Sequence, residues 1–251
     1  MFDWRGFKWV GAAWEGQVGR GGVGVLIKDD WTVADEVSLS SKGIESIWVS
    51  VGNKGVADTL LGVVYFTPHC GREVFDKGAK IIDFVLEKQR EGLKVVIMGD
   101  LNAHFDENGV AQDNKASFLS DLSQMAGLSI MNWQPGVAGK WTWASGGQHS
   151  VLDYVLLSGG LVERIDRFVV DDEGFFDIGR DHNLMFWYIG TGKEKETVSP
   201  KAKRKVRKEW RRRVGGNVNW GAHRVSIEDR MDRFAADMMS TPASGWTAEG
   251  C

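Results

Sequence analysis

The sequence has few of the features that mark secreted or membrane proteins. It contains two cysteines, Cys70 and Cys251, which are too few for a disulfide framework and have no metal-ligand spacing. No apolar run approaches the roughly 20 residues of a membrane-spanning helix. The N-terminus lacks the apolar core of a signal peptide, and no internal repeat is present. We therefore expect a soluble, intracellular protein with plain thiols and no membrane partner.

What the chain does have is an ordinary globular composition with an uneven charge distribution. Hydrophobic residues make up 43% and charged residues 26% of the 251 residues, which argues against disorder throughout. Residues 191–251 hold 14 Lys and Arg against 8 Asp and Glu, so this part carries +6 and residues 1–190 carry −9 of the net −3. We predict a domain over 1–190, followed by a basic linker and short helical tail over 191–251.

The spacing of apolar residues predicts a layered α/β domain. Helical periodicity covers residues 73–91 and 114–127, and glycines mark the ends of both. Residues 53–55 suit a hairpin tip, and residues 226–239 suit a short amphipathic helix in the tail. Short apolar runs bounded by glycine and polar turns predict strands over residues 22–27, 44–51, 59–65, 94–100, 141–144, 151–157 and 184–189.

The strongest chemical motif, Gly99-Asp100-Leu101-Asn102, lies at the end of the apolar strand 94–100. Asp100 and Asn102 are two residues apart, so on a continuing strand they would face the same side. A carboxylate there can take a proton from water or bind a hard cation, and an amide can orient a phosphate. A turn in which both side chains merely satisfy backbone groups explains the same residues. The motif alone leaves both interpretations open.

Two further motifs place acidic residues beside a histidine. Asp153 stands inside an apolar strand, where an unpaired carboxylate is costly, so it requires a donor such as a histidine. The segment Arg180-Asp181-His182-Asn183 supplies one ahead of the last predicted strand. Because neighbouring strand residues point opposite ways, Asp181 and His182 suit one cation ligand and one phosphate-facing imidazole. Taken singly, each motif also fits a structural pair or a solvated loop.

In this order the three motifs resemble the endonuclease/exonuclease/phosphatase family, the fold of abasic-site endonucleases and pancreatic-type DNases. The segment 63–68 is similar to the family's strand that bears an active-site tyrosine, here Tyr65, and Trp141-Thr142-Trp143 is similar to its aromatic–Thr–Trp strand. The Gly-Gly-Val run within 20–25 looks like that of non-LTR retrotransposon endonuclease domains. The resemblance covers about residues 14–189. It implies a sandwich of two mixed β sheets with flanking helices.

The resemblance also implies a role for each motif residue. Asp100 would orient or deprotonate the attacking water, and Asn102 would help to hold the water and the scissile phosphate. His182 would contact the phosphate and pair through its other ring nitrogen with Asp153, while Tyr65 would donate to a phosphate oxygen. The implied ligands of a Mg²⁺ or Mn²⁺ ion are Asp181, Asp100 and Asn102.

The chain departs from the family pattern in two places. The family opens with a strand that carries an Asn and a later strand that carries a metal-binding Glu, and we expect both to lie upstream of Met1. Glu15 is the nearby carboxylate, and we interpret it as a surface residue. Arg180 replaces the usual small Ser before Asp-His and would add positive charge beside the phosphate. We therefore expect a domain that lacks its opening strand and helix and is a poor or inactive nuclease by itself.

The basic run 201–213 holds nine basic residues and one acidic residue. It could bind nucleic-acid phosphates, serve as a nuclear-import patch, or be a solvated linker. In a retrotransposon it would begin the connector to a reverse-transcriptase region. The residues of this run that we expect to contact nucleic acid are Lys203, Arg204, Lys205 and Arg207.

The combined features predict a monomeric, Mg²⁺-dependent phosphodiester hydrolase, a DNA endonuclease domain of retrotransposon origin. A phosphatase of a small phosphorylated substrate shares the same core motifs and is the first alternative. A non-catalytic remnant, or a protein that binds nucleic acid without cleaving it, is the second. Nuclear location follows only if the basic run is an import signal.

Overall fold

The structure is a computed structural model that describes residues 6–12, 22–53, 55–174 and 181–189. Several predictions fall outside these residues, namely those for Glu15, Arg180, the basic run 201–213 with Lys203, Arg204, Lys205 and Arg207, and the helix 226–239. No helix of the described residues is long and apolar enough to cross a membrane. The chain divides into a first unit, Met1–Pro135 with Ser150–Arg164, and a second unit, Gly136–His149 with Ile165–Cys251.

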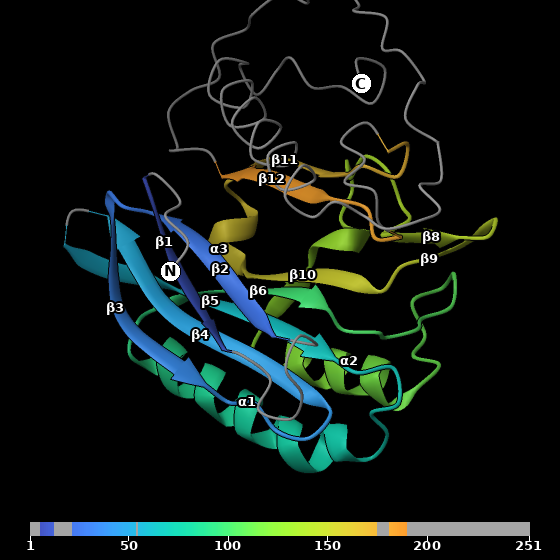
Figure 1. The fold of residues 1–251 in the computed structure, drawn as a ribbon, viewed down its shortest axis with the longest axis horizontal. Helices are drawn as coiled ribbons and strands as arrows, with labels where there is room; N and C mark the ends of the chain where they lie inside the picture. The colour runs from blue at the N-terminus through green and yellow to red at the C-terminus, as the bar shows by residue number, and fades with distance from the viewer. Residues whose placement is uncertain (1–5, 13–21, 54, 175–180, 190–251) are drawn as a thin grey trace, which may run out of the picture. The chain divides into compact units, whose positions relative to one another are not determined.

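A six-stranded mixed sheet with the order β3-β4-β5-β6-β10-β7 forms the centre of the first unit. Its strands are β3 (Trp31–Ser38), β4 (Ile44–Asn53), β5 (Val56–Phe66), β6 (Lys94–Asp100), β7 (Leu128–Ile130) and β10 (Asp153–Ser158). Only β5 and β6 are parallel in this sheet. A parallel pair needs a crossover connection, and helix α1 (Glu73–Arg90) provides it. In Figure 1, α1 and α2 (Asn114–Met125) lie together beneath the sheet.

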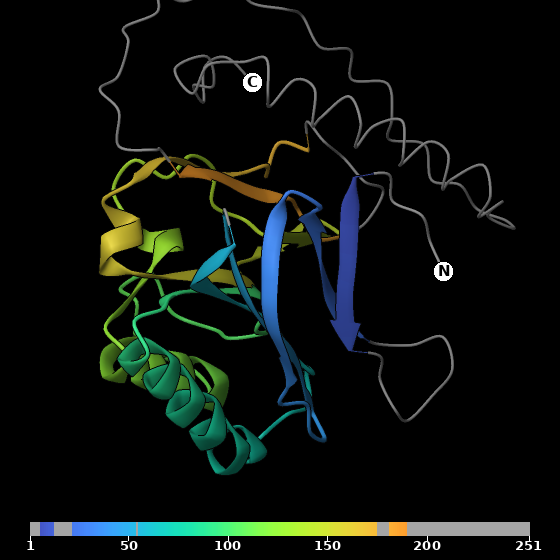
Figure 2. The ribbon, with the colours of Figure 1, turned by 90° about the vertical axis from the view of Figure 1, so that its left-hand side faces the viewer.

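The two faces of this sheet are covered by different elements (Figure 2). The helices α1 and α2 cover one face, and the antiparallel pair of β1 (Phe7–Ala12) and β2 (Val23–Lys28) covers the other. Along β4, residues with even numbers, such as Trp48, belong to the apolar cluster on the helix side. Odd-numbered residues, such as Ile47 and Val49, belong to the cluster beneath β1 and β2. Burial on both faces explains why β4 has apolar residues at both even-numbered and odd-numbered positions.

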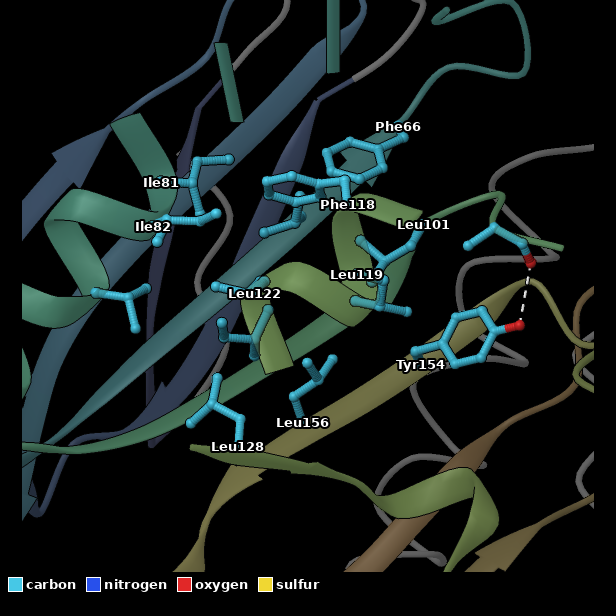
Figure 3. Packing of buried hydrophobic residues seen from close by; sticks show 14 of the residues in the cluster. Phe66, Ile81, Ile82, Leu101, Phe118, Leu119, Leu122, Leu128, Tyr154 and Leu156 are labelled. Atoms are coloured by element: carbon cyan, nitrogen blue, oxygen red, sulfur yellow. Dashed lines mark hydrogen bonds between the residues drawn. The ribbon is translucent and has the colours of Figure 1, made fainter. Parts of the chain in front are cut away.

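The larger core lies between the sheet and the two helices (Figure 3). Phe118 of α2 packs edge-on against Phe66 of β5, with 5.6 Å between the ring centroids. Helix α2 begins at a strong N-cap, because the Asp113 side chain accepts a hydrogen bond of 2.7 Å from the Ala116 amide. Other buried residues drawn in Figure 3 are Ile81, Ile82, Leu101, Leu119, Leu122, Leu128 and Leu156.

The remaining described elements are short. The 3₁₀ helix η1 (Met131–Trp133) and helix α3 (Gly159–Val162) belong to the first unit. Strands β8 (Trp143–Ser145) and β9 (Gln148–Ser150) form a hairpin, and Gly146 and Gly147 at its tip have φ of 59° and 85°. Such positive φ values suit the favoured two-residue hairpin turn. In the second unit, β11 (Ile165–Val170) pairs antiparallel with β12 (Met185–Ile189).

Candidate active site

The candidate site of the first unit is a row of polar side chains on one face of the six-stranded sheet. Asp100 of β6 and Asp153 of β10 are direct partners in the antiparallel register, so their side chains share a face. Tyr65 of β5 and Asp100 each lie two residues beyond the parallel pair Val63 and Met98. Because side chains alternate along a strand, Tyr65 lies on that same face. Three predicted catalytic residues from three adjacent strands therefore line up.

The end of β6 and the turn after it have an unusual backbone, and at Gly99 this backbone lies close to β5. Gly99 has φ of 142°, and a Cβ atom there would lie 2.0 Å from the Val64 carbonyl oxygen. Only glycine accommodates both the conformation and this close approach. Asn102 follows with φ of 45°, a left-handed value that asparagine tolerates better than most residues. The chain thus turns sharply at the point where the motif residues stand.

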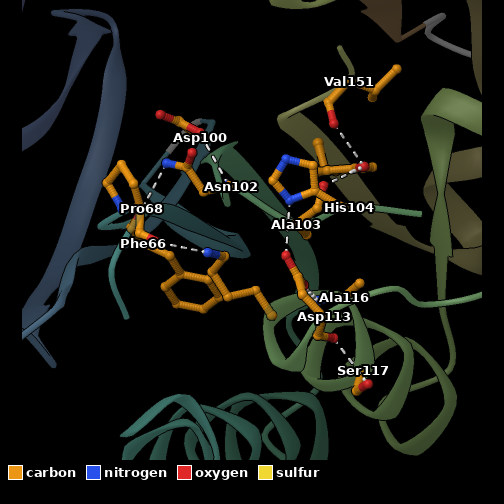
Figure 4. A network of polar contacts seen from close by, with 12 residues as sticks. Phe66, Pro68, Asp100, Asn102, Ala103, His104, Asp113, Ala116, Ser117 and Val151 are labelled. Carbon is orange, nitrogen blue, oxygen red and sulfur yellow. Dashed lines mark hydrogen bonds and ion pairs between the residues drawn. The ribbon is translucent and has the colours of Figure 1, made fainter. Parts of the chain in front are cut away.

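Asn102 is bonded to its surroundings on two sides, as Figure 4 shows. Its backbone amide donates to Asp100 Oδ1 over 3.1 Å, and its side-chain Nδ2 donates to the Phe66 carbonyl oxygen over 2.8 Å. The side chain is 8% exposed. These are the local contacts of a turn, and they also fix Asp100 relative to the end of β5. Asp100 is thus placed by the register of β6, whereas Asn102 is placed by its hydrogen bonds in the turn and not by continuation of the strand.

The Tyr154 hydroxyl bonds to the same turn. Its hydroxyl lies 3.0 Å from the carbonyl oxygens of both Ala103 and Val151, and the contact to the Ala103 carbonyl is drawn in Figure 3. Burial raises the pKa of the Tyr154 phenol far above its ordinary value, and the charges of Asp113 and Asp153 add to the effect. The phenol therefore stays protonated and can donate one hydrogen bond at any physiological pH.

Tyr65 is half-buried beside two carboxylates. Burial raises the pKa of its phenol, and the negative charges of Asp100 and Glu45 raise it further because both oppose formation of a phenolate. The hydroxyl is thus a hydrogen-bond donor at neutral pH. That property suits the role that the family resemblance implies, a donor to a phosphate oxygen.

Glu45 is a buried acidic residue beside Tyr65 that belongs to none of the predicted motifs. It is the direct cross-strand partner of Tyr65 in the pairing of β4 with β5, and it is only 4% exposed. Its Oε2 accepts a hydrogen bond of 2.5 Å from the backbone amide of Gly22. The signal in the sequence was an acidic residue in phase with the apolar positions Ile47 and Val49.

In the second unit, two of the predicted motifs pair with each other. The Asn183 amide donates to the Thr142 carbonyl oxygen over 2.7 Å, and Trp143 forms an antiparallel bridge with His182. The indole Nε1 of Trp143 donates to Asp181 Oδ2 over 3.1 Å. Asp181 is exposed and His182 is half-buried. The aromatic–Thr–Trp segment thus positions the Asp-His pair that follows it by about forty residues in the chain.

His104 has a different setting from the motif residues. Its Nδ1 lies 2.9 Å from Asp113 Oδ2 at the start of α2, and the imidazole is exposed (Figure 4). Burial by itself would raise the pKa of Asp113, but the Ala116 amide and His104 outweigh it, so this pKa lies below its ordinary value. His104 therefore pairs with the N-cap of a helix.

The predicted site residues of the first unit offer oxygen ligands to a divalent cation. The described residues contain no group of three or more His, Cys, Asp or Glu placed to hold a metal ion. Of the predicted ligands in the first unit, Asp100 supplies a carboxylate and Asn102 supplies an amide. Mg²⁺ is commonly held by one or two carboxylates together with waters and substrate phosphates. This all-oxygen donor set fits a hard cation that completes its coordination with substrate.

Comparisons with known proteins agree on one family. A family model described as the endonuclease/exonuclease/phosphatase family matches residues 2–199. The search of curated proteins gave no match. Among solved structures, the endonuclease domain of TRAS1, a telomere-specific non-LTR retrotransposon, is 20% identical, with a TM-score of 0.55 over 76% of this chain and 83% of that one.

A second solved structure has the same fold. The 3'-5' exonuclease NExo from Neisseria meningitidis is 15% identical, with a TM-score of 0.53 over 74% of this chain and 80% of that one. At these identities the similarity concerns the fold, and it confirms the predicted α/β architecture of mixed β sheets with flanking helices. The match of the family model covers residues 2–199, which is most of the chain. The chain belongs to the endonuclease/exonuclease/phosphatase family.

Proposed function

We propose that this chain is a Mg²⁺-dependent phosphodiesterase that acts on DNA, an endonuclease domain of the non-LTR retrotransposon type. The observation that carries the proposal is the alignment of Asp100 and Asp153 as cross-strand partners, beside an Asn102 turn that is held by its own hydrogen bonds. A phosphodiester needs a group that activates water and donors that neutralise the phosphate. The row formed by Tyr65, Asp100 and Asp153, with Asn102 in the turn beside it, supplies both kinds of group.

In the proposed mechanism each residue has one task. Asp100 orients the attacking water and accepts its proton, and the Asn102 side chain helps to hold the water beside the phosphate. Tyr65 donates a hydrogen bond to a phosphate oxygen. His182 contacts the phosphate through one ring nitrogen and Asp153 through the other, which fixes its tautomer. A divalent cation supplies positive charge that stabilises the charge developing on the phosphate when it is bound.

We propose that Asp181, Asp100 and Asn102 hold this cation, either Mg²⁺ or Mn²⁺. Asp181 is exposed, and the indole of Trp143 holds one of its oxygens, so its carboxylate is positioned in advance. The preference for DNA over a small phosphorylated substrate rests on the basic run 201–213, because clustered Lys and Arg bind the phosphate backbone. Nuclear location and a monomeric state are part of the same proposal.

A phosphatase is the second candidate function. A solved structure of similar fold is described as the 3' phosphatase NExo bound to a product DNA hairpin, with a TM-score of 0.52 and 15% identity over 73% of this chain. The same fold therefore carries phosphomonoester chemistry in another protein. A panel of a closed circular plasmid, a 3'-phosphorylated hairpin and an inositol phosphate distinguishes the two functions, since only an endonuclease cleaves an internal bond in closed DNA.

The direct test is plasmid nicking by residues 1–251 during a Mg²⁺ titration. We expect slow nicking that requires the metal and is abolished by Asp100→Ala, because the described residues offer the cation few carboxylate ligands. Nicking that survives Asp100→Ala would contradict the proposal.

A further inference from the structure

Glu45 is a buried carboxylate at a position where the fold would accept an apolar residue. It lies on the face of β4 that carries Ile47 and Val49, which pack in the apolar cluster beneath β1 and β2. Glu45 is only 4% exposed. A buried charge costs several kcal/mol unless it is paired and hydrogen-bonded. A carboxylate in this place therefore calls for a partner.

The partner that holds Glu45 is a backbone amide. Gly22, at the start of β2, donates to Oε2 over 2.5 Å. Among the residues that the structure describes, no Lys, Arg or His forms an ion pair with Glu45. The position of the carboxylate is thus fixed by a main-chain amide next to a neighbouring strand.

The residue next to Glu45 on the same face is Tyr65. In an antiparallel pair, directly opposed side chains have Cβ atoms about 4.5–5.5 Å apart, and Glu45 and Tyr65 are directly opposed. Asp100 lies on the other side of Tyr65, on β6. The phenol is therefore flanked by carboxylates from both neighbouring strands. Both raise its pKa, after the larger effect of burial, which agrees with close approach on both sides.

We propose that Glu45 is a positioning residue for Tyr65: its carboxylate, fixed by the Gly22 amide, lies across the strand pair from the phenol and holds the ring and hydroxyl at the substrate edge of the sheet. The row of polar side chains then runs over four adjacent strands, from Glu45 through Tyr65 and Asp100 to Asp153. Its effect on catalysis rests on the proposed function, whereas the coupling of the two side chains does not.

A double-mutant cycle on the full chain tests this coupling. Glu45→Gln keeps an oxygen that accepts from Gly22 and removes only the charge, and Glu36→Gln on exposed β3 is the matched control for loss of a negative charge. We expect Glu45→Gln to lower the turnover of nicking by roughly 10- to 100-fold with little change in KM, as outer-shell partners do. In a Tyr65→Phe background the same change should have no further effect. Equal losses in both backgrounds would overturn the proposal.

A second readout does not depend on activity. NMR of isotope-labelled tyrosine Cζ carbons reports the protonation of each of the three tyrosines. We expect Glu45→Gln to lower the pKa of Tyr65 and Glu36→Gln to leave it unchanged, because Glu45 is the cross-strand partner of Tyr65 whereas Glu36 pairs with Val49. An unchanged Tyr65 pKa in a folded Glu45→Gln protein would overturn the pairing. If Glu45→Gln does not fold, Glu45→Asp withdraws the carboxylate by one methylene and should lower the pKa in the same direction.

The two proposals fail separately. If no form of the chain shows nicking that depends on Asp100, the nuclease function is wrong, and the NMR titration still decides whether Glu45 and Tyr65 are coupled. If nicking depends on Asp100 but Glu45→Gln behaves like Glu36→Gln, the nuclease function stands and Glu45 serves only to fix the start of β2.

Discussion

Replacing Tyr154 by Phe removes one buried hydroxyl and leaves the ring in place. The ring is 1% exposed and packs near Phe105, with 5.7 Å between the centroids. Its hydroxyl lies 3.0 Å from the carbonyl oxygens of Ala103 and Val151, which belong to segments on either side of the site. Because a phenol donates one hydrogen bond, loss of the hydroxyl leaves one of these carbonyl groups without its donor and loosens the turn that carries the motif residues.

The size of the effect follows from the cost of an unsatisfied buried acceptor. A hydrogen bond contributes about 0.5–1.5 kcal/mol net, and leaving a buried partner unsatisfied costs about 1–3 kcal/mol. We expect Tyr154→Phe to lower the free energy of unfolding by about 1–3 kcal/mol. For a chain of this size each kcal/mol lowers Tm by roughly 2–4 °C. Calorimetry and urea unfolding measure both quantities.

Tyr188→Phe is the matched control, because Tyr188 is 47% exposed and loses the same atom. Equal changes in stability for the two variants would refute the reasoning. The pH dependence gives a second check. The pKa of Tyr154 in the folded chain is raised, so its stabilising effect is complete below the ordinary phenol pKa of about 10. It is lost as the pH rises from there toward the folded-state value, and Tyr154→Phe should lack this alkaline loss.

Three further changes test the turn, the helix cap and the histidine partner. Gly99→Ala should cost about 3 kcal/mol or more in urea unfolding, since its Cβ would lie 2.0 Å from the Val64 carbonyl oxygen; Gly92→Ala, with a positive φ but open space, should cost less, and equal costs would contradict the clash. Asp113→Ala should cost about 1 kcal/mol through loss of the α2 cap. Because the pKa of Asp113 is lowered, its contribution to stability is full above an ordinary carboxyl pKa of about 4 and is lost as the pH falls through the pKa of the folded state. The stabilities of the parent chain and of Asp113→Ala should therefore converge in acid, and a constant difference between them would oppose this account. Asp153→Asn should reduce nicking by orders of magnitude with stability nearly unchanged, whereas full activity would make Asp153 structural.

The sequence by itself determined the motifs and several of the elements, because both depend on residues close together in the chain. Strands β7, β9 and β11 had no counterpart among the predicted strands. The apolar run 94–100 is β6, and the helical periodicity over 73–91 and 114–127 corresponds to α1 and α2. The hairpin tip at 53–55 joins β4 to β5. The order of the motifs led to the family, which the match over residues 2–199 confirms. The roles of the site residues remain predictions.

Only the tertiary structure decided which side chains meet. Glu45 and Tyr65 are twenty positions apart, and their pairing depends on the register of β4 against β5, which no local pattern specifies. The position of Asn102 depends on a bond from its side chain to the Phe66 carbonyl oxygen on another strand. Registers and close approaches arise from packing among distant segments, because a shift of one residue moves every side chain to the opposite face.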